Sequence, residues 1–138
     1  MRLLVCSIVI GAVLPAASGQ TPTPTTSPQT PHPVLSTADA AQHVGENRTV
    51  CGQIVNEYTS ATSHGTPTFI DLDQPYPHSI FDLVIWGDNK ETVGAFPKTG
   101  KVCASGTITL YRNRPEILLR DWHSWYVPSD AQQRASVP

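Results

Sequence analysis

Residues 101–122 read KVCASGTITLYRNRPEILLRDW. Residues 101–111 are rich in β-branched and apolar side chains and contain one glycine, a pattern typical of a strand. Asn113 and Pro115 are turn formers, and residues 116–122 again have the composition of a strand. This stretch therefore predicts two consecutive strands that are joined by the turn at residues 112–115.

Three further strands are predicted upstream, at residues 49–58, 68–72 and 80–86. A short helix is expected within residues 36–45, and weak helical character is found at residues 88–96. Five strands of this length cannot leave two open edges at low cost, so closure into a barrel is favoured. We predict an all-β fold: a five-stranded Greek-key barrel of the OB type, with one short helix at its N-terminus and another between strands three and four.

The first residues have the pattern of a targeting segment. Met1-Arg2 precedes an apolar run at residues 3–14, which is followed by small residues at 16–19. The run is too short to cross a bilayer, so residues 1–19 are predicted to be a cleaved signal peptide that leaves no membrane span. Residues 20–34 are a Pro/Thr-rich linker, predicted disordered like the tail at 128–138. The folded domain is expected at 35–127, in a secreted or periplasmic protein.

Charge argues against a strongly electrostatic partner. The chain has 9 Lys+Arg and 11 Asp+Glu, so loss of Arg2 with the signal peptide leaves 8 against 11, a net charge of −3. Tight binders of nucleic acid usually carry a basic surplus, because phosphate neutralisation dominates their affinity. A role of that kind must therefore rest on a local patch.

Two cysteines, Cys51 and Cys103, remain after signal cleavage. Export to an oxidising compartment favours a disulfide between them. The alternative is a pair of buried cysteines that never join.

Several strings resemble a group of small bacterial OB-fold domains that occur alone in exported proteins and beside extracellular nuclease domains. They are VCG at 50–52, GTPTFIDL at 65–72, VIWG at 84–87, GKVC at 100–103 and YRNRPEI at 111–117. The resemblance covers about residues 35–122 and implies a nucleic-acid-binding type of barrel. It also implies that the first and fourth strands pair, which would bring Cys51 and Cys103 together. The aromatic run WHSWY at 122–126 departs from the family pattern.

The turn between the last two strands is the first candidate binding site. OB-folds commonly bind ligands on this side of the barrel, where aromatic rings could stack on bases and guanidinium groups could contact phosphates. The alternative is that the tyrosine packs on the rim and the arginines are solvated or paired with neighbouring acids. The polar loop at residues 59–67 is a second candidate. The candidate ligand-binding residues are Tyr58, Trp86, Tyr111, Arg112, Arg114 and Arg120.

The sequence contains no recognisable catalytic or metal-binding motif. No Cys-x-x-Cys, His-x-His or His-Glu-x-x-His spacing occurs, and neither a nucleophile elbow nor a phosphate loop is found. Asp71 and Asp73 flank Leu72, but Asp-x-Asp before a proline turn is typical of turn formation. We therefore expect no catalytic residue, no metal site and no cofactor.

The leading hypothesis is an exported, non-catalytic binding module for single-stranded nucleic acid or an oligonucleotide. The alternative is an interaction domain for a cell-envelope protein or a cell-wall polymer. The acidic net charge, the linker and the aromatic run at 122–126 favour that alternative.

Overall fold

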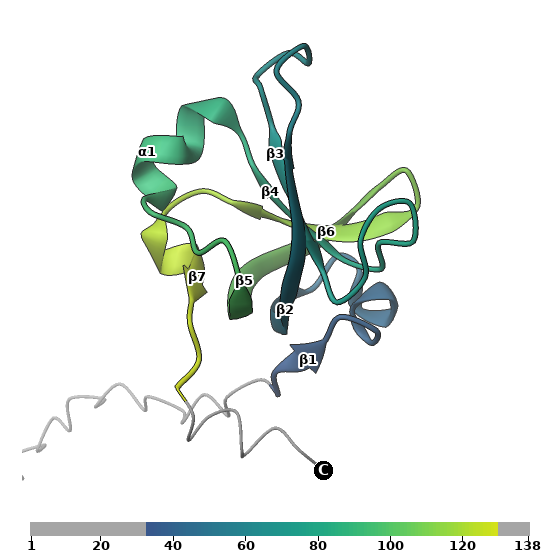
Figure 1. The fold of residues 1–138 in the computed structure, drawn as a ribbon. Helices are drawn as coiled ribbons and strands as arrows, with labels where there is room; N and C mark the ends of the chain where they lie inside the picture. Colours follow the sequence, from purple (N-terminus) through teal and green to yellow (C-terminus); the bar gives the residue numbers. More distant parts are fainter. Residues whose placement is uncertain (1–32, 130–138) are drawn as a thin grey trace, which may run out of the picture. The chain divides into compact units, whose positions relative to one another are not determined.

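The computed structural model describes residues 33–129. The predicted signal peptide, nearly all of the predicted linker and most of the predicted tail lie outside the described residues. Short strands and 3₁₀ helices (η) accompany the longer strands of the barrel (Figure 1). In chain order the elements are β1 Leu35–Ser36, η1 Ala40–His43, β2 Asn47–Thr59, β3 Thr68–Leu72, β4 Asp82–Ile85, η2 Gly87–Asn89, α1 Lys90–Val93, β5 Gly100–Tyr111, β6 Arg114–Leu119, η3 Trp122–Ser124 and β7 Trp125–Tyr126.

Five strands close into a barrel in the order β2-β3-β4-β6-β5, and β5 returns to pair with β2. All neighbours are antiparallel except β4 and β6, which run parallel. The two longest strands, β2 and β5, each pair with different neighbours along their two halves, which lets a small sheet curl shut. The predicted all-β, five-stranded barrel of the OB type is confirmed.

A short N-terminal helix is present within residues 36–45, as predicted, but it begins after Ser36–Asp39, the predicted start, and it is of the 3₁₀ type. Ser36 belongs to β1, where it lies opposite Cys51, and only Ala40–His43 form a single 3₁₀ turn. The Ser36 hydroxyl donates to the Asp39 carboxylate at 2.6 Å. The Asp39 amide donates to the Ser36 hydroxyl at 3.3 Å, so the predicted exchange between Ser36 and Asp39 is present ahead of the 3₁₀ turn.

The barrel interior is filled by alternate residues of the strands, because successive side chains of a strand point to opposite faces. Val93 of α1 and Ala40 of η1 are fully buried in the same cluster. The aromatic run at 122–126 continues past the last barrel strand, and Trp125 packs on Phe96 with ring centroids 4.8 Å apart. In Figure 1, α1 lies at one side of the barrel beside β7. The buried interior residues of the strands are Val50, Ile54, Ile70, Leu72, Leu83, Ile85, Val102, Ala104, Ile108, Ile117 and Leu119.

Cys51 and Cys103 form a disulfide between facing positions of β2 and β5, with their Cα atoms 4.0 Å apart. This pairing excludes the alternative of two separate buried thiols. Ser36 of β1 and Tyr126 of β7 flank the two cysteines from either side. A disulfide is compatible with an oxidising compartment. No helix among residues 33–129 is long and apolar enough to cross a membrane.

Reduction of this disulfide should lower the free energy of unfolding by about 4 kcal/mol, because the bond closes a long loop in the unfolded chain. The two cysteines are separated by 52 positions. Guanidinium unfolding followed by tryptophan fluorescence, with and without reductant, measures the difference. The Cys51→Ala/Cys103→Ala double variant is the control and should not respond to reductant. Equal unfolding midpoints for the oxidised and reduced wild-type protein would contradict the prediction.

Candidate ligand-binding cleft

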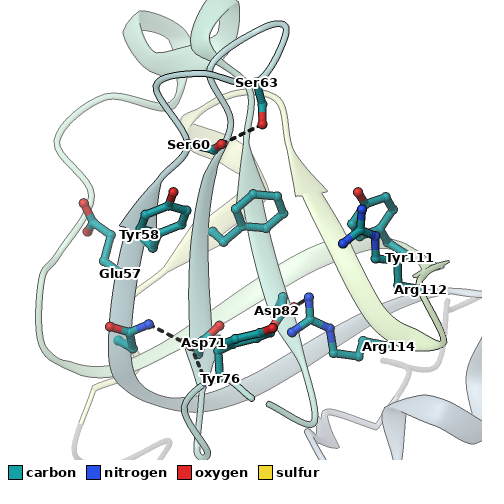
Figure 2. Close-up of a pocket in the computed structure, with 12 residues that line it drawn as sticks. Glu57, Tyr58, Ser60, Ser63, Asp71, Tyr76, Asp82, Tyr111, Arg112 and Arg114 are labelled. Carbon is teal, nitrogen blue, oxygen red and sulfur yellow. Dashed lines mark hydrogen bonds and ion pairs between the residues drawn. The ribbon is translucent and has the colours of Figure 1, made fainter. Parts of the chain in front are cut away.

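A cleft of about 630 Å³ opens on the outer face of the barrel (Figure 2). Strands β2, β3 and β4, the loop that follows β2, the loop before β4 and the β5–β6 hairpin all contribute to its walls. The lining residues are Asn56, Glu57, Tyr58, Ser60, Ser63, Phe69, Asp71, Tyr76, Asp82, Tyr111, Arg112 and Arg114.

Strand alternation explains how polar groups reach this face. Because Ile70 and Leu72 enter the core, Asp71 between them points outward. The register places Asp71 opposite Asp82 of β4, and Asp82 beside Glu116 of β6. We call these three residues the carboxyl row. They are only 3%, 2% and 9% exposed, so other parts of the chain must cover them.

The loop between β3 and β4 provides much of this cover. The amide of Tyr76 donates to the Asp71 carboxylate at 2.8 Å, and the side-chain amide of Asn56 donates to the same oxygen at 2.9 Å. The Ser79 hydroxyl donates to the Asp82 carboxylate. Hydrogen bonds to buried acids therefore hold the loop against the barrel and place Tyr76 at the cleft.

Arg114 is the cation that pairs with the carboxyl row. A guanidinium nitrogen lies 3.5 Å from an Asp82 carboxylate oxygen. The guanidinium carbon also lies 5.5 Å from the centre of the Tyr76 ring, within the range of a cation–π contact. Arg114 thus joins the loop, β4 and β6 at one point, as Figure 2 shows.

The row has more acids than its cation can neutralise. Burial raises the pKa of Asp82, and neighbouring Asp71 raises it further, while the Ser79 hydrogen bond and the Arg114 charge lower it. Burial likewise raises the pKa of Glu116, with a further increase from Asp82. Both acids therefore hold protons at a higher pH than they would in water.

The β5–β6 hairpin carries Arg112 at its tip. Arg112 and Asn113 have φ values of 48° and 66°, as a two-residue turn of type I′ requires. Asparagine tolerates this left-handed backbone, whereas arginine adopts it less readily. The Arg112 guanidinium carbon lies 5.3 Å from the centre of the Tyr111 ring. Strained residues of this kind cluster at ligand sites, which draws attention to Arg112.

Four of the six sequence-predicted residues line the cleft: Tyr58, Tyr111, Arg112 and Arg114. Whether they bind a ligand stays a prediction.

The other two, Trp86 and Arg120, are not among the lining residues. Trp86 covers Gly65 so closely that a Cβ there would lie 2.8 Å from the ring. Arg120 follows β6, and its carbonyl accepts from the Thr92 hydroxyl at 2.7 Å. Trp86 and Arg120 both lie near the ends of predicted strands. The sequence does not indicate at which end of the barrel each of them lies.

Sequence reasoning missed the floor of the cleft. Asp82 is the one charged residue in the apolar run 80–86, and that contrast is a signal that could have identified it. Tyr76 offers no comparable signal, because it stands in a proline-rich turn. The second candidate loop, at residues 59–67, contributes Ser60 and Ser63, whose hydroxyls lie 2.6 Å apart. Asp73 forms the Asp-x-Asp pair with Asp71 in the sequence, but it is not among the lining residues of the cleft. Its carboxylate accepts a hydrogen bond from the Gln53 amide.

Within residues 33–129, no group of three or more His, Cys, Asp or Glu side chains is arranged to hold a metal ion.

Comparisons with known proteins give little that is specific. No protein-family model matches the chain, and no curated protein matches it. A crystal structure described as an aspartyl-tRNA synthetase from Leishmania major Friedlin superposes with a TM-score of 0.46 at 8% sequence identity. The match covers 72% of this chain and 21% of that one, so the chain spans about a fifth of that protein's length.

The Glu116→Gln variant should gain stability relative to the wild-type protein as pH rises. A carboxyl whose pKa is raised by folding stabilises the fold fully below its unfolded pKa. That contribution is lost as pH rises through the folded pKa. The variant has no carboxyl at this position and does not lose stability in this way. Its free energy of unfolding in urea, minus that of wild type, should therefore increase from about pH 4 to about pH 7. Glu91→Gln, which changes an exposed side chain of α1, is the control. A pH-independent difference between Glu116→Gln and wild type would contradict the assignment.

Proposed function

We propose that this protein is an exported binding module whose cleft holds a short stretch of single-stranded nucleic acid, with no catalysis of its own. The observation that carries the proposal is the position of the cleft. It lies over β3 and β4, between the β2–β3 loop and the β5–β6 hairpin. These correspond to strands two and three and the two loops with which OB-folds bind oligonucleotides and oligosaccharides.

The exposed rim of the cleft is aromatic. Tyr58, Tyr76 and Tyr111 are 60%, 70% and 43% exposed. Figure 2 shows Tyr58 and Tyr111 at opposite sides of the cleft. Exposed rings that face a groove provide stacking surfaces for bases of any sequence, at about 1–3 kcal/mol per base.

The carboxylates at the cleft do not argue strongly against an anionic ligand, because they are engaged with the protein itself. Asp71 and Asp82 are buried and accept hydrogen bonds from the chain, and Glu57 pairs with Lys98. Arg112, by contrast, is exposed at the hairpin tip. With only Arg112 and Arg114 as cations among the lining residues, the log–log salt slope should be shallow, about −1.4 at most for two phosphate contacts.

The second candidate is an exported module that binds a cell-wall polymer or another saccharide. It is supported by the oxygen-rich lining of the cleft, where Asn56, Ser60 and Ser63 could contact sugar hydroxyls beside the tyrosine rings. OB clefts also bind oligosaccharides. Competition by soluble wall fragments against a bound oligonucleotide distinguishes the two ligands.

Replacing Arg112 with glycine should weaken binding of a fluorescein-labelled oligothymidylate by about tenfold, the loss of one charge-assisted contact. Glycine suits the left-handed turn, so the hairpin should keep its shape. Fluorescence anisotropy at low salt measures the affinity.

The control is Arg120→Ala, which removes the same charge outside the cleft. Its affinity should stay within about twofold of wild type, since an exposed charge beyond the cleft adds only a weak, screened attraction. If both variants weaken binding equally, the attraction is general rather than located at the hairpin. The absence of binding to wild type at low salt would refute the nucleic-acid proposal.

A further inference from the structure

The carboxyl row places three acids in register on neighbouring strands, with one guanidinium against them. Asp82, at the centre, faces Asp71 from β3, Glu116 and Arg114 from β6, and Ser79 from the β3–β4 loop. The Tyr76 ring of the same loop lies against Arg114. Like charges directly opposite each other on paired strands are destabilising. Burial adds a further cost to each ionised carboxyl. A row with one cation therefore takes up protons readily.

The protonation state of Asp82 determines what Arg114 is paired with. When Asp82 is ionised, its carboxylate holds the guanidinium at 3.5 Å, and a phosphate must compete with it. When Asp82 is protonated, the ion pair is lost, and the new hydroxyl can donate to neighbouring Asp71. The Arg114 side chain already lines the cleft and is 24% exposed, so its release requires no rearrangement of the backbone.

We propose that Arg114 is a pH-controlled ligand contact, which is held by Asp82 near neutral pH and freed for an anionic ligand when the carboxyl row takes up a proton. The inference rests on the proposed function, that the cleft accepts an anionic ligand. Protonation of Asp82 then strengthens anion binding. By linkage, the bound anion favours protonation of Asp82 by the same free energy and so raises the pKa of Asp82. Affinity rises as pH falls through the Asp82 pKa.

Anisotropy titrations with labelled oligothymidylate between about pH 7.5 and about pH 4.5 test this inference. Thymine suits the test because it does not take up a proton in this range. Wild-type affinity should rise by about tenfold on acidification, since one new charge-assisted contact becomes available. Asp82→Asn keeps the size of the side chain and an acceptor for Ser79 but cannot ionise. It should bind at neutral pH as tightly as wild type does in acid, with little further change.

Asp88→Asn is the matched control, since it removes an exposed carboxyl that does not line the cleft. It should keep the wild-type pH profile. Any pH effect that arises elsewhere in the protein would be the same in Asp82→Asn. If Asp82→Asn retains the full acid-induced rise, the inference is wrong.

A second measurement needs no ligand. In NMR titrations of the free protein, the Arg114 Nε–H signal should shift with the same midpoint as the Asp82 carboxyl carbon, and the shift should vanish in Asp82→Asn. An Arg114 signal that does not follow Asp82 refutes the switch, whatever the protein binds. If the two signals titrate together but no oligonucleotide binds at any pH, the switch stands and the proposed ligand fails. If wild type binds the oligonucleotide with no pH dependence, the proposed ligand stands and the switch fails.

Discussion

Pairing between β2 and β5 closes the barrel, and the other parts of the structure depend on it. The ladder runs from Asn47 opposite Thr107 to Ile54 opposite Gly100, with the disulfide at its centre. Closure fixes which face of every strand looks inward, because side chains alternate along each strand. On β3, β4 and β6 the apolar side chains point inward, so the alternating residues of the carboxyl row point outward. The cleft is therefore a consequence of barrel closure, and its geometry follows from the register of strands that the closure aligns.

The cleft is held together by groups that would usually be avoided in a folded protein. Buried carboxylates are costly unless they are hydrogen-bonded and paired. Here Asp71 binds the amide of Tyr76, and Asp82 binds Ser79 and Arg114. These bonds order Tyr76 and Arg114, neither of which belongs to the buried core. Removal of one acid would therefore affect the position of Tyr76 or Arg114 as well as the local charge.

Much of the fold could be predicted from local patterns. The strand at residues 68–72 has the predicted bounds, since turn-forming residues enclose it, and the hairpin tip at Arg112 and Asn113 follows from turn chemistry. The parts that could not be predicted depend on distant contacts. Ser36 pairs with β2, so the helix begins only at Ala40, and Tyr76 reaches the cleft because Asp71 binds its amide. Trp86 lies outside the cleft for a similar reason, because its ring packs over Gly65.

The cross-link between Cys51 and Cys103 has a consequence for the resistance of the domain to proteolysis. Every loop from the end of β2 to the start of β5 lies between the two cysteines. Exposed loop tips are the preferred targets of proteases, and residues 61–64 form such a tip. A single cut there would leave two fragments that are still covalently joined and still paired as strands. A domain nicked at this loop would thus keep both parts of its barrel together.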